Sequence, residues 1–393
     1  MKYRTLGNTG LKVSEIAFGA EWYVERPYSD VEEIVRHCEE KGINFLDCWM
    51  SEPTVRTNLG KAIKDTRDKW IIQGHIGSTW QNNQYVRTRE MDKVKEAFKD
   101  LMERLQIETL DFGMIHYVDT FEDYDEIMSG EFIEYVRELK DNGTIKHIGL
   151  STHNSDIAFL AAENPEIELL MFSINPAYDM FPPMGDIEEY RDDDNYEGLA
   201  GLDPRRAELY QLCEENGTPI TVMKGYASGR LFDENDSPFG VALTPVQCIH
   251  YALEQKGVAS IFVGVNNTKE LGAAIEYESA SEDEKEYKSI LAKAPKHSFE
   301  GKCMYCGHCA PCTSGIDVAG LIKLYDLAVI HDEVPQSVRE HYNNLTSVLT
   351  FAARYAFGCI ICQIIVMFTN ALRNLIMNNC QIIELYKACN IYS

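Results

Sequence analysis

Basic residues are scarce in this sequence relative to acidic ones. The 393 residues contain 37 Lys and Arg against 62 Asp and Glu, which gives a formal net charge of −25. Such an excess of negative charge repels nucleic acids and anionic lipid surfaces. We therefore expect neither a nucleic acid nor a membrane among the partners of this protein.

The N-terminal residues lack the apolar run of a secretion signal. Residues 1–13, MKYRTLGNTGLKV, contain charged side chains and an early turn instead, so we expect a cytoplasmic protein. The composition, 45% hydrophobic and 25% charged, is that of a globular protein. The length allows one large domain with an appendage, or two domains.

A glycine-rich phosphate-binding fingerprint is also missing after the first expected strand, which argues against an open dinucleotide-binding sheet. Short apolar runs alternate with segments of helical periodicity through most of the chain. The expected strands cover residues 15–19, 43–47, 70–75, 110–116, 145–151, 168–175, 219–225 and 259–264. This α/β alternation predicts a closed parallel (β/α)8 TIM barrel over residues 1–282, with an open doubly wound sheet as the alternative.

Three further segments carry local predictions. Residues 3–15, YRTLGNTGLKVSE, predict a hairpin around an Asn-Thr-Gly turn. Residues 87–106 predict one amphipathic helix. The acidic residues 176–203 form a long loop after the sixth expected strand, on the barrel face where active sites are built. We interpret this loop either as a solvated insertion or as a substrate lid.

Cysteine is used sparingly through the first 302 residues, and residues 303–312, CMYCGHCAPC, then contain four. The spacing C-x2-C-x2-C-x2-C leaves no room for two separate zinc knuckles and suits the corners of an iron–sulfur cubane. A [4Fe-4S] cluster is therefore predicted, with zinc and unmetallated thiols as alternatives. The ligands are Cys303, Cys306, Cys309 and Cys312. Residues 283–350 are expected to form a linker and a helical cluster-binding appendage.

Residues 351–393 lack the charge of the rest of the chain and are rich in Ile, Asn and Cys. The CIIC at 359–362 begins a second ferredoxin-like run, but cysteine is missing at the next expected positions. We interpret this tail as the frameshifted remnant of a second cluster motif, so that the residues after 362 are not native sequence. A packed helix and a membrane anchor are the alternatives.

Several motifs, in their order along the chain, resemble the aldo/keto reductase superfamily. They are RTLGNTGLKVSEIAFG, INFLD, LDFGMIH, IKHIGLST and FVGVNNTKEL. The cysteine run resembles the subgroup of that superfamily with a C-terminal iron–sulfur domain, and the resemblance covers about residues 3–350. It implies a barrel that binds NADP(H) across its C-terminal face and reduces carbonyls by hydride transfer.

The resemblance also implies a catalytic tetrad of Asp, Tyr, Lys and His. Asp47 and His116 fall on the Asp and His positions, whereas Glu52 and His75 stand at the Tyr and Lys positions. A Glu–His pair can still move a proton, because burial and the charge of a partner can bring the pKa of either group close to neutral pH. The alternatives are satisfied polar residues at strand ends for the two histidines and a solvated loop carboxylate for Glu52.

The resemblance implies a cofactor site in three parts. Ser151, Thr152 and Ser173 contact the nicotinamide; Lys224, Gly225 and Gly229 contact the pyrophosphate; Gly264, Asn267 and Lys269 contact the adenosine phosphate. Each of these glycines can instead belong to a plain turn. Lys269 is the one cation in its motif, so the sequence leaves the choice between NADPH and NADH open.

The sequence supports three functional hypotheses. The first is an oxidoreductase that combines an NADP(H)-binding barrel with an iron–sulfur centre, acting on a small carbonyl or redox substrate and using an electron-transfer protein. The second is a carbonyl reductase whose cluster is purely structural. The third is a non-catalytic binding or electron-transfer module.

Overall fold

The computed structural model describes residues 1–24, 26–180 and 203–296, together with single residues between 321 and 339. The cysteine run at 303–312, the tail at 351–393 and most of the acidic loop lie outside the described residues. The chain divides into two units, Met1–Leu199 with Glu208–Ser298, and Ala200–Ala207 with Phe299–Ser393. The active-site residues discussed below all belong to the first unit.

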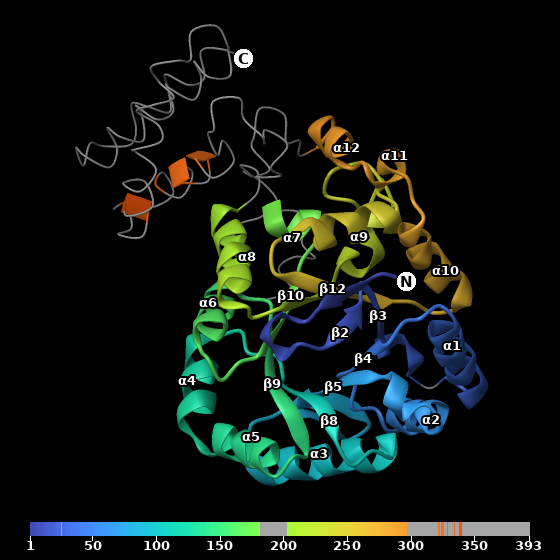
Figure 1. Ribbon diagram of the computed structural model, residues 1–393, viewed down its shortest axis with the longest axis vertical. Coiled ribbons are helices and arrows are strands. Elements are labelled where there is room, and N and C mark those ends of the chain that lie inside the picture. The colour runs from blue at the N-terminus through green and yellow to red at the C-terminus, as the bar shows by residue number, and fades with distance from the viewer. Residues whose placement is uncertain are drawn as a thin grey trace, which may run out of the picture. The chain divides into compact units, whose positions relative to one another are not determined.

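Eight parallel strands close into a barrel in the first unit (Figure 1). Around the barrel they are β3 (Ile16–Gly19), β4 (Phe45–Cys48), β5 (Ile71–Ile76), β8 (Leu110–Ile115), β9 (Ile145–Thr152), β10 (Leu169–Ser173), β11 (Ile220–Met223) and β12 (Val258–Gly264). Each strand pairs in parallel with both neighbours. The predicted (β/α)8 barrel is therefore confirmed.

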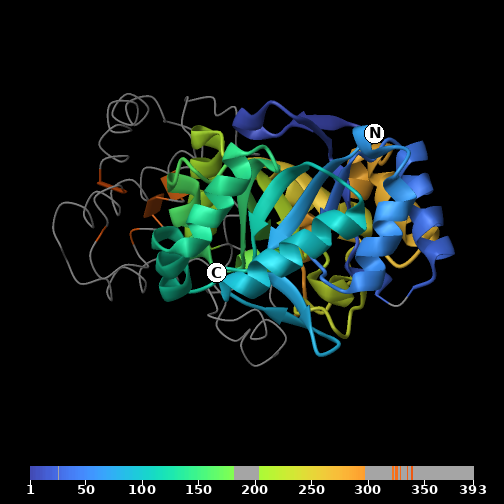
Figure 2. The same cartoon turned by 90° about the horizontal axis from the view of Figure 1, so that it is seen from below.

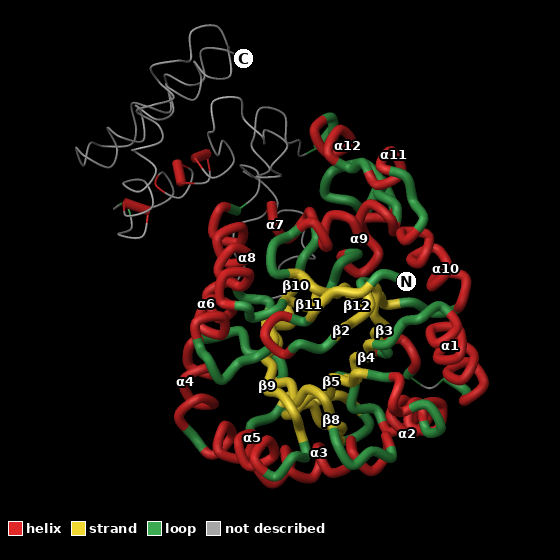
Figure 3. Tube along the Cα trace, in the orientation of Figure 1, coloured by secondary structure: helices red, strands yellow, loops and turns green. Residues whose placement is uncertain are grey.

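Helices surround these strands on the outside (Figure 3). They are α1 (Tyr28–Glu40), α2 (Pro53–Ile63), α3 (Met91–Leu105), α4 (Phe121–Ser129), α5 (Glu131–Asp141), α6 (Ser155–Glu163), α7 (Pro176–Met180), α8 (Pro204–Asn216), α9 (Pro245–Glu254), α10 (Thr268–Ile275), α11 (Glu282–Lys285) and α12 (Lys288–Ala292). Within the described ranges, none of the helices has the length and hydrophobicity needed to cross a membrane.

Two β-hairpins do not belong to the eight-stranded barrel, and Figure 2 shows them at opposite ends of it. The predicted N-terminal hairpin is confirmed as β1 (Tyr3–Thr5) and β2 (Lys12–Ser14). The second, β6 (Ser78–Gln81) with β7 (Gln84–Arg87), was not predicted. Because β7 ends at Arg87 and α3 begins at Met91, the prediction of a helix from residue 87 was wrong at its start.

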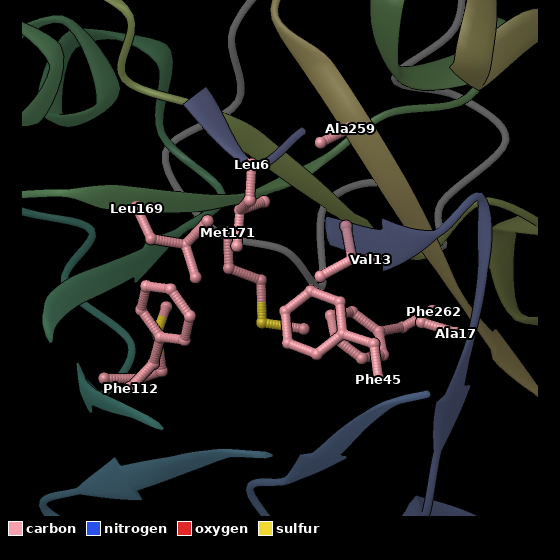
Figure 4. Packing of buried hydrophobic residues seen from close by; sticks show 10 residues of the cluster. Leu6, Val13, Ala17, Phe45, Phe112, Leu169, Met171, Ala259 and Phe262 are labelled. Carbon is pink, nitrogen blue, oxygen red and sulfur yellow. The ribbon is translucent and has the colours of Figure 1, made fainter. Parts of the chain in front are cut away.

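The core fills the barrel interior from both the strands and the first hairpin (Figure 4). Phe45 and Phe262 lie in contact, with ring centroids 4.8 Å apart. Leu6 and Val13 of the N-terminal hairpin are fully buried in the same cluster. The hairpin therefore covers the amino-terminal end of the barrel, which leaves the opposite end for a ligand.

Gly60 permits close approach of α2 to α3. A Cβ atom added at Gly60 would lie 2.1 Å from the carbonyl oxygen of Arg104, and backbone atoms of a packed helix cannot move aside easily. We expect Gly60→Ala to lower the free energy of unfolding by roughly 1–3 kcal/mol, measured by urea denaturation.

Gly272 in α10 is the matched control for this substitution. A Cβ atom at Gly272 meets no atom within 4 Å, so Gly272→Ala should be neutral or stabilising by about 0.5–1 kcal/mol through helix propensity. Equal effects of the two substitutions would contradict the close helix contact at Gly60.

Candidate active site

A cavity of about 800 Å³ opens at the carboxyl ends of the barrel strands. Its lining includes residues from the ends of seven strands or the turns that follow them: Gly19, Asp47, His75, His116, Ser151, Lys224 and Gly264. In barrels of this kind, the carboxyl-end loops carry the reactive groups. The size is that of a site for a cofactor and a small substrate.

Four side chains form a continuous hydrogen-bonded chain along this cavity. Asp47 Oδ1 lies 3.0 Å from His75 Nε2. His75 Nδ1 lies 2.8 Å from His116 Nδ1, and His116 Nε2 lies 2.7 Å from the Tyr85 hydroxyl. The structure thus brings together three predicted residues, Asp47, His75 and His116, and adds Tyr85.

The carboxylate of Asp47 sets the direction of the protons in this chain. A carboxylate only accepts hydrogen bonds, and Asp47 Oδ1 also accepts one from Gln73 Nε2 at 2.8 Å. His75 therefore donates from Nε2, and when neutral it accepts at Nδ1 from His116. A neutral His116 with its proton on Nδ1 accepts at Nε2 from the Tyr85 hydroxyl. Both nitrogens of His75 and of His116, and the Tyr85 hydroxyl, have a hydrogen-bond partner in this arrangement.

The environment favours the uncharged forms of His116 and Tyr85, the two members of the hydrogen-bonded chain farthest from Asp47. Burial lowers the pKa of His116 well below its ordinary value, and the charges of His75 and Arg89 act in the same direction. Burial raises the pKa of Tyr85 to about 12, although Arg87 opposes this shift. At neutral pH, His116 is therefore an uncharged imidazole and Tyr85 a protonated phenol.

Aromatic packing holds the chain in place. The Trp49 ring stacks on His116 at 5.8 Å between centroids and meets Tyr85 edge-on at 5.2 Å. Cys48, next to Trp49, is 1% exposed, and burial raises its thiol pKa to about 12. Such a thiol is not a nucleophile at neutral pH, so Cys48 is a packing residue in this site.

Glu52 does not join this chain. Its carboxylate oxygens accept hydrogen bonds from the backbone of Thr54 at 2.9 Å and Val55 at 2.7 Å. Glu52 is thus the N-cap residue of α2, and Pro53 occupies the first helical position. A carboxylate with two backbone donors stabilises the helix, and Glu52 is not among the described residues that line the cavity.

Part of the predicted cofactor site lies on the cavity. The lining contains Ser151, Lys224, Gly225, Gly229 and Gly264. The Ser151 hydroxyl accepts a hydrogen bond from the Tyr117 backbone at 2.8 Å. In the turn after β11, Lys224, Ser228 and Gly229 have positive φ values of 58°, 57° and 88°. Backbones in this conformation are strained in residues with a side chain, and such strain concentrates at ligand sites.

The remaining predicted cofactor residues make other contacts. The buried Thr152 hydroxyl donates to Asp119 at 2.8 Å. Ser173 is also buried and lies at the end of β10. The Asn267 side chain caps α10 by accepting from Glu270 at 3.0 Å. Lys269 lines a separate cavity of about 240 Å³ between α1 and α10. None of these four is among the described lining of the main cavity.

Tyr85 and Glu270 are lining residues that sequence reasoning missed. The signal for Tyr85 was present, because Asn82 and Asn83 form the turn of the hairpin with positive φ values of 52° and 61°. Asparagine tolerates this conformation. Glu270 lies in the first turn of α10, and its carboxylate accepts from the Asn266 backbone at 2.8 Å. The prediction of an adenosine phosphate site at residues 264–271 rested on the cation Lys269 and left out the carboxylate of Glu270.

In the parts of the chain that the structure describes, no group of three His, Cys, Asp or Glu side chains is arranged to hold a metal ion. The predicted ligands Cys303, Cys306, Cys309 and Cys312 lie outside those parts. The described cysteines, Cys38, Cys48, Cys213 and Cys248, are free and buried.

The protein is a parallel (β/α)8 barrel, and the cavity at its carboxyl-terminal face is lined by ionisable side chains. The model of the aldo/keto reductase family matches residues 15–244, which is more than half of the chain. The protein therefore belongs to the aldo/keto reductase family.

Similarity to individual proteins agrees with this assignment. The chain is 27% identical over 192 residues to aldo-keto reductase YhdN of Bacillus subtilis, covering 46% of this chain and 55% of the relative. It is 30% identical over 167 residues to L-galactose dehydrogenase of Arabidopsis thaliana, covering 40% and 50%. The chain thus spans about half the length of these curated relatives.

The fold is also that of a solved structure, aldo-keto reductase AKR11C1 from Bacillus halodurans. The TM-score is 0.58 at 23% identity, and the match covers 75% of this chain and 97% of that chain. At this identity the likeness establishes the fold alone.

Proposed function

We propose that this protein is an NADP(H)-dependent oxidoreductase of the aldo/keto reductase type that interconverts a small carbonyl compound and its alcohol. The observation that carries the proposal is the chain from Asp47 through His75 to His116 on the cavity wall. Carbonyl reduction needs a proton where the oxygen becomes negative. This chain can store a proton beside a carboxylate and deliver it to the cavity.

The described residues fit a nicotinamide cofactor. The cavity has the required volume, and the strained turn from Lys224 to Gly229 presents backbone on its wall, as phosphate-binding turns do. Met171 and Phe262 supply apolar surface deeper in the same cavity. When bound, the reduced cofactor supplies the hydride. The protein's own residues position the carbonyl and exchange the proton.

The chemistry assigned to the side chains follows from their partners. Asp47 stabilises a proton on His75, because its carboxylate lies 3.0 Å from Nε2. His116 passes the proton between His75 and the cavity side, since burial keeps it from retaining a charge. Trp49 stacks on His116 and excludes water from one face of the imidazole. Glu52 is assigned to the helix cap and takes no part in proton transfer.

We also propose that Cys303, Cys306, Cys309 and Cys312 hold a [4Fe-4S] cluster within a region at 283–350 that follows the barrel domain at 1–282. Their spacing supports this. The tail at 351–393 is proposed to be a frameshifted remnant. A hydride carries two electrons and a single cluster accepts one, so transfer from NADPH to the cluster would need a flavin or a substrate radical between them. An electron-transfer protein of the cytoplasm would then be the partner that takes the electrons from the cluster.

The test is an anaerobic titration of the purified holoprotein with NADPH, with cofactor fluorescence and cluster absorbance followed together. Binding accompanied by bleaching of the cluster band is expected for an electronically coupled oxidoreductase. Binding and aldehyde reduction without bleaching would indicate a carbonyl reductase with a structural cluster. If NADPH does not bind, the oxidoreductase proposal is wrong. Iron and sulfide analysis of the same sample decides whether the cluster exists.

Glu270 is expected to discriminate between NADPH and NADH. Its carboxylate accepts from the backbone of Asn266 at 2.8 Å and the side chain of Asn267 at 3.0 Å. The N–H groups of Asn266 and Asn267 are therefore already bound to the Glu270 carboxylate. The negative charge of this carboxylate would repel the 2′-phosphate of NADPH at the start of α10. We expect Glu270→Gln to tighten NADPH binding roughly tenfold, or about 1.4 kcal/mol, with a much smaller change for NADH.

Fluorescence titration with both cofactors measures this discrimination. Glu276→Gln is the control, since Glu276 is an exposed carboxylate at the other end of the same helix. If Glu270→Gln changes the affinities for both cofactors by the same factor, the carboxylate does not lie near the 2′-position.

A further inference from the structure

The β6–β7 hairpin, inserted between β5 and α3, delivers a phenol to the active site. Tyr85 lies on β7, lines the cavity, and places its hydroxyl 2.7 Å from His116 Nε2. The position that the family pattern reserves for tyrosine is Glu52, which caps α2. The site thus has a tyrosine that comes from a different segment of the chain.

Two hydroxyl groups anchor this hairpin to the loop that precedes α2. Ser78 donates to the Trp49 carbonyl at 2.6 Å, and Ser51 donates to the Thr79 carbonyl at 2.7 Å. Both serines are 1% exposed. Because buried side-chain hydrogen bonds of this kind rigidify a segment, the hairpin that carries Tyr85 is fixed to the barrel at its base.

We propose that Tyr85 is the group that exchanges the proton with the substrate oxygen. This inference rests on the proposed oxidoreductase function. All four members of the hydrogen-bonded chain line the cavity, but Asp47, His75 and His116 are buried whereas Tyr85 is partly exposed. Tyr85 is therefore the member most accessible to a substrate in the cavity. A phenol protonated at neutral pH is a suitable acid for an oxygen that gains an electron pair.

The hydrogen-bonded chain from Asp47 to Tyr85 has two proton arrangements. The hydrogen bonds between His75, His116 and Tyr85 run in opposite directions in the two. In the neutral form, the Tyr85 hydroxyl donates to His116, and the phenol oxygen is free to accept a proton from an alcohol. When one more proton is added, His75 carries both of its N–H groups beside Asp47. His75 then donates to His116, His116 donates from Nε2 to Tyr85, and the Tyr85 hydroxyl turns toward the substrate oxygen.

The proton balance of carbonyl reduction follows. The carbonyl carbon gains a hydride from the nicotinamide, and the carbonyl oxygen takes the proton of Tyr85. Tyr85 recovers a proton from His116, and His116 recovers one from His75. The product is an alcohol, and the chain returns to its neutral form. Alcohol oxidation runs through the same transfers in reverse.

This route predicts opposite pH dependences for the two directions. Reduction uses the extra proton and therefore slows as the pH rises, whereas oxidation needs the neutral chain and accelerates. The titratable and charged groups that face the chain come from several elements and are Asp47, Arg87, Arg89, Tyr117 and His153. The two arginines disfavour charge on His116, and His75 is the imidazole that lies 3.0 Å from the Asp47 carboxylate.

The test compares the wild-type holoprotein with Tyr85→Phe. With NADPH and p-nitrobenzaldehyde, kcat is expected to fall about a hundredfold, as is typical for loss of a general acid, while the Kd for NADPH stays within about threefold. The residual activity should lose its pH dependence. Tyr124→Phe is the control, because the Tyr124 hydroxyl bonds to the Leu160 carbonyl on the outside of the barrel.

A second readout needs no turnover. Nitrogen NMR of histidine-labelled protein, with His116 assigned through His116→Gln, should find the His116 proton on Nδ1 in both the wild type and Tyr85→Phe, because neutral His75 accepts a hydrogen bond there. Only the Nε2 resonance should shift in Tyr85→Phe, because that nitrogen loses the hydrogen bond of the phenol. A proton on Nε2 in the neutral wild type would overturn the proposed route.

The outcomes separate this inference from the function on which it rests. If the wild type binds NADPH and reduces the aldehyde but Tyr85→Phe is nearly as active, the oxidoreductase function holds and Tyr85 is not the proton donor. If the wild type neither binds NADPH nor reduces the aldehyde, both the function and the role of Tyr85 are wrong.

Discussion

Replacing Asp47 by Asn is expected to slow carbonyl reduction roughly a thousandfold. The substitution keeps the shape of the side chain and its contact with Gln73 but removes the negative charge 3.0 Å from His75 Nε2. A neutral amide does not stabilise a proton on an imidazole, and the loss of such a carboxylate from a catalytic histidine costs several orders of magnitude. The measurement is kcat with NADPH and p-nitrobenzaldehyde across a range of pH.

Asp111→Asn is the matched control for Asp47→Asn. Asp111 is also a buried carboxylate on a barrel strand, but its Oδ2 accepts from the Ile72 backbone and from Arg67, both at 2.9 Å, near the amino ends of β5 and β8. We expect this variant to lose stability and to retain kcat. If Asp47→Asn keeps more than about a tenth of the wild-type kcat, the chain does not carry the proton.

Removing the buried guanidinium of Arg56 is expected to destabilise the barrel by roughly 3–5 kcal/mol. The side chain is 1% exposed and binds Ala97 and Asp100 of α3, both at 3.1 Å, and the Met50 carbonyl at 3.3 Å. It also reaches the Ser78 carbonyl at 3.4 Å. Arg56→Ala removes a donor from the carbonyls of Met50, Ser78 and Ala97 and leaves a cavity beside them. Asp100 keeps its ion pair with Arg104.

Urea denaturation followed by circular dichroism measures this loss, with Arg36→Ala as the control. Arg36 in α1 is 68% exposed and pairs with Glu40 at 3.7 Å, so its removal should change the free energy of unfolding by less than about 0.5 kcal/mol. A comparable small change for Arg56→Ala would mean that water or neighbouring donors replace the guanidinium. Because Arg56 contacts Ser78, we also expect Arg56→Ala to disturb the hairpin that carries Tyr85.

The barrel was predictable from the sequence because strands buried on both faces appear as continuous apolar runs. Asp47 and His116 were predicted from the resemblance to the family, and each lies at or directly after the carboxyl end of an expected strand. The β6–β7 hairpin was not predicted because Thr79, Trp80 and Tyr85 were read as part of a connection, and its Asn-Asn turn is a weaker signal than Asn-Gly.

The assignment of Glu52 illustrates a different limit. The family position suggested a proton shuttle, but the local sequence Ser51-Glu52-Pro53-Thr54 also indicates a helix start, because proline favours the first helical position. Local hydrogen bonds to Thr54 and Val55 determine where this carboxylate lies. The meeting of Tyr85 with His116 depends on how the hairpin packs on Trp49, and no spacing along the chain contains that information.

The position of Tyr85 on an inserted hairpin changes how related sequences should be compared. An alignment column scores the residue at one place in the chain, and at position 52 this chain has Glu where the family pattern has tyrosine. A hydroxyl supplied to the site from another segment does not appear in that column. Chains that have lost the tyrosine of the family pattern should therefore be sorted by whether the connection between the third barrel strand and its helix carries an aromatic hairpin.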